Sequence, residues 1–272
     1  MSMVKVGDAN MEFYVEGSGA PLLMISGFTA QASGWSEPFT GRLQESFSTI
    51  RYSHRGTGTS ERLEGEITLR DLADDAAGLL STLGIEKAHV FGVSMGGMVA
   101  QELTLNHPQR VQGLVLGCTA CGGEHRVAAE PEVMALLMPE PGLSREEQVR
   151  RSWPALTTPE FLESHRDVME DRLRVSLVNP TPIETAVRQM AAVQAFDSFD
   201  RLPQIGAPTL VLHGDQDVLV PVANAQLLKD RIPGAELCIV PGAGHLFAFE
   251  FPEESAAAVV EFLARVPVGA GS

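Results

Sequence analysis

The sequence predicts an α/β protein: a mostly parallel central sheet, flanked by helices and interrupted by an inserted helical lid. From residue 22 to residue 117, short apolar runs typical of buried strands alternate with amphipathic runs typical of helices. The same alternation returns after residue 208. Such alternation produces a parallel sheet with helices on both faces. We therefore expect residues 1–118 and 201–272 to form one core, and residues 119–200 to form the lid.

The first elements are two short strands at residues 2–7 and 11–16, joined by a Gly-Asp-Ala-Asn turn. A continuous apolar strand follows at residues 22–25, which is typical of a central position. It ends in a loop at residues 26–29, and loops at strand ends are where α/β sheets place ligand-handling groups. A helix at residues 36–45 and a strand at residues 48–52 come next.

The clearest helix begins after Thr68. Its leucines and alanines recur at helical spacing through Leu83. Thr68 can cap the helix, Asp71 adds negative charge to its first turn, and Gly84 ends it. A buried strand at residues 88–91, a helix from Met98 and an apolar strand at residues 111–117 complete the first half of the core.

The pattern changes between residues 119 and 200. Prolines recur there, and amphipathic helical pieces lie between them, such as the run from residue 159 to 177. Strands then return at residues 208–212 and 236–240, and helices at residues 222–231 and 252–265. We expect the Gly-Ala-Gly-Ser tail at residues 269–272 to be frayed.

Composition limits the classes of function. The net charge is −15 and the pI is about 4.8, so nucleic acid and anionic membrane are disfavoured as partners. Three cysteines are too few for a disulfide framework and favour a reducing, cytoplasmic setting. We expect no signal peptide and no membrane span, because no apolar run reaches the required length. A small-molecule substrate fits this composition, and homo-oligomerisation is left open.

Ser94 lies where the strand at residues 88–91 turns sharply into a helix. Gly92 and Gly96 flank it in a Gly-x-Ser-x-Gly pattern, and they remove the Cβ atoms that would clash in so tight a turn. This strand–turn–helix context is that of a nucleophile elbow. The alternative is a glycine-rich turn that packs closely or binds a phosphate.

Two later loops supply the partners that a serine nucleophile needs. Asp215 and Asp217 follow one strand and His245 follows the next, so both loops lie at the same edge of a parallel sheet as Ser94. His245 can accept the serine proton, and a carboxylate can fix its tautomer. We favour Asp217 as that carboxylate and expect Asp215 to brace its loop. We expect His213, at a strand end, to satisfy a backbone group.

Acyl transfer also requires donors for the oxyanion. The Met95 N–H group, at the start of the elbow helix, is one candidate. The Phe28 N–H group, in the loop after the strand at residues 22–25, is the other.

At this point the chain resembles the α/β-hydrolase superfamily. The resemblance covers residues 10–118 and 201–265 and is closest to enol-lactonase-like and small carboxylesterase-like members with a helical lid. It is carried by five stretches in order: Ser26-Gly27-Phe28, Arg55-Gly56-Thr57-Gly58-Thr59-Ser60, Gly92-Val93-Ser94-Met95-Gly96-Gly97, His213-Gly214-Asp215-Gln216-Asp217 and Gly244-His245. It implies a Ser94–Asp217–His245 triad, with Phe28 and Met95 as oxyanion donors.

The chain departs from the family pattern at two positions. Ser26 stands where the family often has His, which puts the hydrogen bonds of that His in doubt. Ser53 stands where the family often has Asp, which is expected to weaken an ionic brace at Arg55. A serine at position 94 argues against epoxide hydrolases and haloalkane dehalogenases, which need Asp there.

We therefore expect a serine hydrolase that cleaves a small, apolar ester or lactone through an acyl-enzyme on Ser94, without cofactor or metal. A carbon–carbon bond hydrolase or a perhydrolase could use the same triad. A non-catalytic ligand-binding receptor and a lid-mediated interaction module are further alternatives.

The lid offers two sets of candidate substrate contacts. Apolar residues could line an acyl pocket, although sealing the lid onto the sheet is the favoured role for each: Met134, Leu136, Leu137, Met138, Trp153, Phe161, Met169 and Met190. Arginines could grip a carboxylate, although a solvated position is favoured for each: Arg126, Arg145, Arg150, Arg151, Arg166, Arg172 and Arg174. The spacing of Cys118, Cys121 and His125 is loosely metal-like but lacks a second pair.

Overall fold

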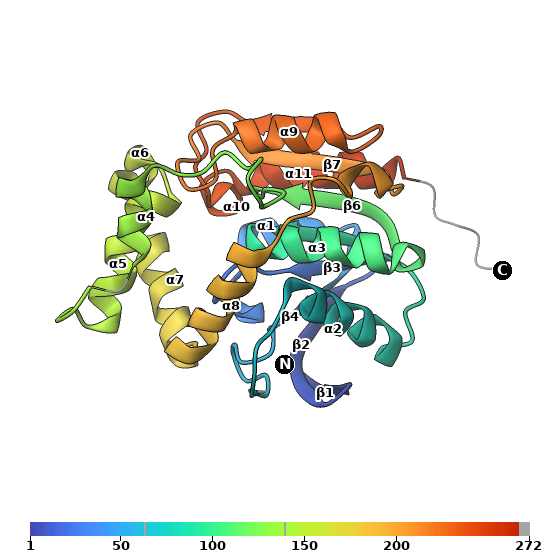
Figure 1. The fold of residues 1–272 in the computed structure, drawn as a ribbon, viewed down its shortest axis with the longest axis horizontal. Helices are drawn as coiled ribbons and strands as arrows, with labels where there is room; N and C mark the ends of the chain where they lie inside the picture. The colour runs from blue at the N-terminus through green and yellow to red at the C-terminus, as the bar shows by residue number, and fades with distance from the viewer. Residues whose placement is uncertain (63, 139, 267–272) are drawn as a thin grey trace.

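One eight-stranded sheet organises the protein, and the computed structural model describes residues 1–62, 64–138 and 140–266. The strand order is β1-β2-β4-β3-β5-β6-β7-β8 (Figure 1). Pairs involving β2 are antiparallel, and every pair from β4–β3 to β7–β8 is parallel. The strands are β1 Ser2–Val6, β2 Ala9–Gly17, β3 Ala20–Ile25, β4 Phe47–Tyr52, β5 Ala88–Val93, β6 Val111–Gly117, β7 Thr209–Gly214 and β8 Glu236–Val240. The predicted fold class is confirmed.

Helices cover both faces of the sheet. One face packs against α2 (Leu69–Thr82), α3 (Met95–Asn106) and α9 (Ala223–Arg231). The other packs against α1 (Glu37–Gln44), α10 (Phe247–Glu250) and α11 (Pro252–Ala264). Successive β3 residues alternate between the two apolar cores, as the two-residue period of a strand requires. Both faces are buried, which explains the continuous apolar runs in the sequence.

Local signals set the boundaries of α2 as expected. The Asp71 N–H group donates to Thr68 Oγ1 at 3.1 Å, and the Thr68 N–H group donates to Asp71 Oδ2 at 2.8 Å. This is a complete capping box, so Asp71 contributes a hydrogen bond as well as charge. Gly84 follows the helix with a φ of +71°, a conformation that favours glycine.

Among the described residues, five α-helices lie between β6 and β7, at one end of the sheet (Figure 1). They are α4 Pro131–Leu137, α5 Arg145–Leu156, α6 Pro159–Ser164, α7 Arg166–Val178 and α8 Ile183–Ala195, and we call residues 119–200 the helical segment. The run expected from residue 159 to 177 is two helices, because His165 leaves helical geometry at φ −129° and ψ 39°.

The helical segment has a small apolar core of its own, formed by Trp153, Phe161, Met169 and Leu173. These side chains seal α5, α6 and α7 together, whereas Met138 is 55% exposed. The short helices η1 Ala32–Gly34, η2 Pro108–Arg110 and η3 Leu202–Gln204 complete the structure. The tail at residues 269–272 lies outside the described residues.

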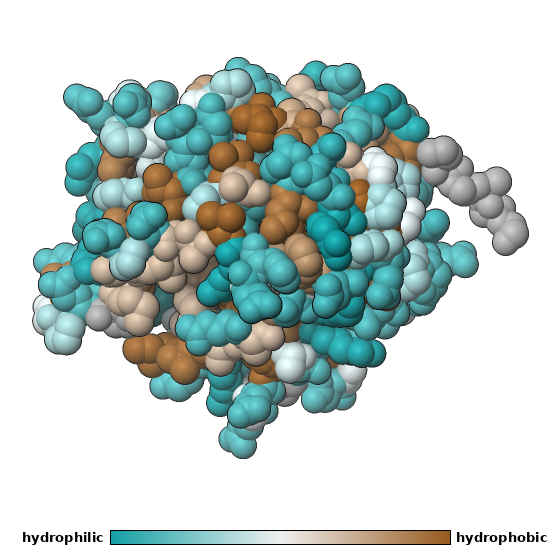
Figure 2. Space-filling view, turned by 45° about the horizontal axis from the view of Figure 1, so that its top comes forward, coloured by the Kyte–Doolittle hydropathy of each residue, from teal (hydrophilic) through white to brown (hydrophobic). Residues whose placement is uncertain are grey.

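The molecular surface matches the acidic composition. The face in Figure 2 is mostly hydrophilic, and apolar side chains reach it in patches between polar ones. No helix among the described residues is long and apolar enough to cross a bilayer.

Candidate active site

The elbow at Ser94 is built as a strained turn between β5 and α3. Ser94 has φ 55° and ψ −124°, a backbone conformation that residues other than glycine rarely adopt. A Cβ on Gly92 would lie 2.2 Å from the Gly96 carbonyl oxygen, and a Cβ on Gly96 would lie 2.2 Å from the Ile25 carbonyl oxygen. Only glycine at these two positions allows β3, β5 and α3 to approach so closely.

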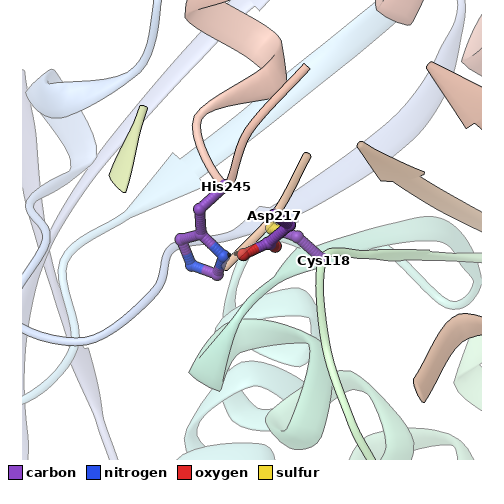
Figure 3. Close-up of side chains that lie close together, drawn as sticks. All are labelled: Cys118, Asp217 and His245. Atoms are coloured by element: carbon purple, nitrogen blue, oxygen red, sulfur yellow. Dashed lines mark hydrogen bonds and ion pairs between the residues drawn. The ribbon is translucent and has the colours of Figure 1, made fainter. Parts of the chain in front are cut away.

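Asp217 and His245 meet beyond the ends of β7 and β8. His245 Nδ1 lies 2.8 Å from Asp217 Oδ2 (Figure 3), and both side chains are buried. The second carboxylate oxygen, Oδ1, accepts the N–H groups of Leu219 at 2.9 Å and Val220 at 2.8 Å. The carboxylate is thereby fixed in one orientation against the imidazole ring.

Two neighbouring residues support this arrangement. Asp215 Oδ1 accepts the Gly242 N–H group at 2.7 Å, which links the β7 and β8 loops. His213 Nε2 lies 2.7 Å from the Val220 carbonyl oxygen, as expected for a backbone partner. It also lies 3.3 Å from Asp217 Oδ2, a second contact that sequence reasoning missed.

The electrostatics of the pair favour an imidazolium beside a carboxylate. Burial alone would lower the pKa of His245, but the charges and hydrogen-bonding groups of Asp217 and Cys118 together outweigh burial and hold that pKa well above its usual value near 6.5. Burial alone would raise the pKa of Asp217, but His245 and His213 hold it well below its usual range. Asp217 therefore stabilises the protonated ring that forms when His245 accepts a proton.

Ser94 is linked to the neighbourhood of this pair through the residues at the end of β6. The Ser94 N–H group donates to the Gly117 carbonyl oxygen at 2.9 Å, and Thr119 Oγ1 donates to the Ser94 carbonyl oxygen at 2.7 Å. Cys118, between Gly117 and Thr119, places its sulfur within 4.8 Å of ligand atoms of Asp217 and His245. In the described part of the chain, Ser94 Oγ and His245 form no hydrogen bond, and such contacts often tighten only when substrate binds.

Cys118 is the site residue that sequence reasoning missed. Its φ of +37° is unusual for a residue other than glycine. In type and distance, Cys118, Asp217 and His245 match a metal-binding group (Figure 3). However, the direct 2.8 Å contact between His245 and Asp217 leaves no room for an ion between those two atoms.

The metal-like spacing noted in the sequence does not bring its three members together. Cys121 is buried, and burial raises the pKa of its thiol to about 11. The His125 ring stacks on Phe199 with ring centroids 3.6 Å apart. Of the three residues, only Cys118 faces the site.

The loop after β3 approaches Ser94 as an oxyanion loop must. A Cβ on Gly27 would lie 3.2 Å from Ser94 Cβ. The helical segment holds both backbone polar groups of Thr29: the N–H group donates to Gln189 Oε1 at 2.8 Å, and the carbonyl oxygen accepts from Thr181 Oγ1 at 2.9 Å. Phe28 lies between Gly27, which approaches Ser94, and Thr29, which the helical segment holds.

The backbone N–H groups of Phe28 and Met95 are available to a ligand. Neither donates to a turn, loop or cap partner within the described residues. Met95 is the first residue of α3, where N–H groups lack intrahelical acceptors. Both N–H groups expected from the sequence to be oxyanion donors are therefore left without a backbone acceptor in the described part of the chain.

A histidine does contact the Ser26 carbonyl group, although it comes from another position in the chain. His54 Nε2 lies 3.1 Å from the Ser26 carbonyl oxygen. Burial lowers the pKa of His54 to about 4, so the ring is neutral near pH 7 and its Nε2–H group can donate to that oxygen.

The expectation of a weakened ionic brace at Arg55 was wrong. Arg55 Nε donates to Asp75 Oδ2 at 2.7 Å, and its second nitrogen bonds the other carboxylate oxygen. Asp75 comes from α2 and is buried, so a distant helix supplies the brace. Ser53 instead donates to Glu12 Oε2 at 2.8 Å.

Comparison with known proteins places this geometry in a family context. The family model described as the alpha/beta hydrolase fold matches residues 20–252. The chain is 31% identical to a putative carbamate hydrolase, RutD, from Azorhizobium caulinodans, over 91% of this chain and 92% of that protein.

Solved structures agree. A thermophilic esterase from Thermogutta terrifontis, with malate bound, matches with a TM-score of 0.84 and 28% identity, over 98% of this chain and 100% of that one. The enol-lactonase from Burkholderia xenovorans LB400 matches with a TM-score of 0.85 and 25% identity, over 97% and 100%.

We predict that Gly96→Ala destabilises the protein by about 2–4 kcal/mol, because the new Cβ meets backbone atoms of β3. Urea unfolding measures the change. Gly41→Ala is the control: Gly41 lies exposed in α1, and no described atom outside its own helix backbone lies within 4 Å of the position that a Cβ would take, so we expect the substitution to stabilise by about 0.5–1 kcal/mol. Equal stability of Gly96→Ala and the parent would contradict the close approach.

We predict that Asp217→Asn lowers the pKa of His245 well below its value in the parent protein, because the Asp217 charge is the strongest of the effects that oppose burial. An NMR titration of the histidine ring protons measures this, with His245→Asn used to assign the signal. Asp215→Asn, in the same loop, should leave the pKa of His245 unchanged. A His245 pKa that is the same in the parent and in Asp217→Asn would rule out the pairing.

Proposed function

The chain belongs to the α/β-hydrolase fold family and is a hydrolase; from this we propose that it cleaves a small ester or lactone through an acyl-enzyme formed on Ser94. The observation that carries the proposal is the 2.8 Å Asp217–His245 pair beside the strained Ser94 elbow. A histidine paired with a carboxylate can accept the proton of a hydroxyl group and return it later in the reaction.

The proposed reaction has two halves. Ser94 Oγ attacks the substrate carbonyl carbon while its proton passes to His245 Nε2, and Asp217 stabilises the imidazolium. The N–H groups of Phe28 and Met95 hold the oxyanion. His245 then gives the proton to the leaving alcohol oxygen, and the acyl-enzyme remains. Water, deprotonated by His245, attacks the acyl carbon and releases the acid, which regenerates Ser94.

The helical segment is proposed to act as the lid that bounds the substrate. It contacts the oxyanion loop through Gln189 and Thr181. It also contacts α10, the short helix that follows His245, where Thr158 Oγ1 donates to Glu250 Oε2 at 2.9 Å. The Phe28 side chain is 37% exposed in this region and offers an apolar surface to an acyl chain. The names of the relatives, a carbamate hydrolase, an esterase and an enol-lactonase, support cleavage of a carbonyl compound.

We predict that Ser94→Ala lowers kcat on an activated ester by at least about 10⁴-fold, because the nucleophile is lost. Mass spectrometry of the intact protein should show one covalent adduct with a fluorophosphonate, and none with Ser94→Ala. Ser164→Ala, exposed on α6, is the control and should behave as the parent. Tight ligand binding with no turnover in the parent would favour a receptor instead.

We predict that kcat/KM falls as the pH drops through the pKa of His245, which lies above 6.5, because only the neutral ring accepts the serine proton. Initial rates from pH 5 to pH 9 measure this acidic limb. In Asp217→Asn the residual activity should show the limb at lower pH. A profile that is flat from pH 5 to pH 9 in the parent would contradict a histidine base.

A further inference from the structure

Residues 117–119, at the end of β6, hold the backbone of Ser94 at both of its polar groups. The Gly117 carbonyl oxygen accepts the Ser94 N–H group at 2.9 Å. Thr119 Oγ1 donates to the Ser94 carbonyl oxygen at 2.7 Å. A Cβ on Gly97 would lie 2.6 Å from Thr119 Cβ, so α3 packs directly against this segment. The strained conformation of Ser94 is therefore fixed relative to residues 117–119.

Cys118 holds a fixed position within the same segment. Its N–H group donates to the Leu212 carbonyl oxygen of β7 at 3.0 Å, and the residue is buried. Its φ of +37° lies in the left-handed region, which costs free energy for a residue with a Cβ and persists only where the surroundings fix it. Glycine adopts this conformation without that cost. The backbone at this position favours glycine, so the cysteine is to be explained by what its side chain contacts.

That side chain contacts the Asp217–His245 pair. The Cys118 sulfur, a carboxylate oxygen of Asp217 and a ring nitrogen of His245 lie within 4.8 Å of one another (Figure 3), and all three residues are buried. Besides Asp217, Cys118 raises the pKa of His245 against the effect of burial. The sulfur is therefore a direct neighbour of the proposed base, while the residues on either side of it bind the proposed nucleophile.

Sulfur at this position fills space beside the pair without competing for its hydrogen bonds. Asp217 Oδ1 accepts two backbone N–H groups, and Oδ2 lies 2.8 Å from His245 Nδ1. A thiol is only a weak donor and a weak acceptor, so it leaves these stronger bonds intact. Without the sulfur, a space lined by charged groups would be open to a water molecule. Water there would weaken the attraction between carboxylate and imidazolium, because it raises the local dielectric constant.

We propose that Cys118 is a positioning residue for His245. Its side chain fixes the imidazole ring relative to Ser94, whose backbone is bound to the residues on either side of Cys118. It also keeps water away from the Asp217–His245 hydrogen bond. This role rests on the proposed function, in which His245 takes the proton of Ser94. Cys118 itself exchanges no proton and forms no bond with the substrate.

The test removes the sulfur in two ways. Cys118→Ala removes it alone, and Cys118→Gly also relieves the left-handed backbone, so the second variant is expected to fold. With 4-nitrophenyl acetate, both should lower kcat by about 10-fold or more, because small misplacements of a catalytic group are costly. KM should stay within about twofold, since His245 acts in both halves of the reaction. An NMR titration of the ring protons should give a lower His245 pKa than in the parent.

Cys121→Ala is the matched control. Cys121 is a buried thiol three residues later, in the apolar core that α2 and α3 cover, so kcat and the His245 pKa should match the parent. Parental kcat and a parental His245 pKa in folded Cys118→Gly, or a loss of stability with neither quantity changed, would overturn the positioning role. If the parent hydrolyses the ester no faster than Ser94→Ala does, the proposed function fails. The His245 pKa in the two variants then still decides whether Cys118 acts on His245.

Discussion

The structure depends on the close approach of three backbone segments at the elbow. Ser94 holds a conformation that costs on the order of 1–3 kcal/mol, and it persists only because its surroundings fix it. The missing side chains of Gly92 and Gly96 let β3, β5 and α3 touch, while β6 binds the Ser94 N–H group. This packing presents the hydroxyl and the first N–H groups of α3 on the same side of the sheet, and the loops after β3, β7 and β8 are arranged around it.

The helical segment is tied to that arrangement from both sides. Glu250 accepts the Gly244 N–H group at 3.1 Å with one oxygen and the Thr158 hydroxyl group at 2.9 Å with the other. The loop that carries His245 and the start of α6 therefore share one buried carboxylate, that of Glu250. On the opposite side, Gln189 accepts the Thr29 N–H group in the loop after β3. A displacement of the segment would break buried hydrogen bonds in both loops, so its position and the geometry of the site are coupled.

The sequence determined much of the fold because its signals are local. Apolar periodicity located the strands, and Gly92, Ser94 and Gly96 located the elbow. Long-range pairings are different, because nothing in the sequence says which side chains of distant elements meet. Arg55 finds its carboxylate on α2, and Cys118 joins the Asp217–His245 pair, only because the sheet brings those segments together. The exposed or buried state of each arginine on α7 likewise depends on how that helix packs.

The charges on the surface of the protein and those buried at the site act differently. A protein of net charge −15 repels small anions at long range, and the Debye length of about 8 Å at physiological salt limits that repulsion to the surface. The Asp217–His245 pair differs from the surface charges, because both side chains are buried and salt screens buried pairs much less. The protonation of His245 therefore depends on its buried neighbours rather than on the acidic surface.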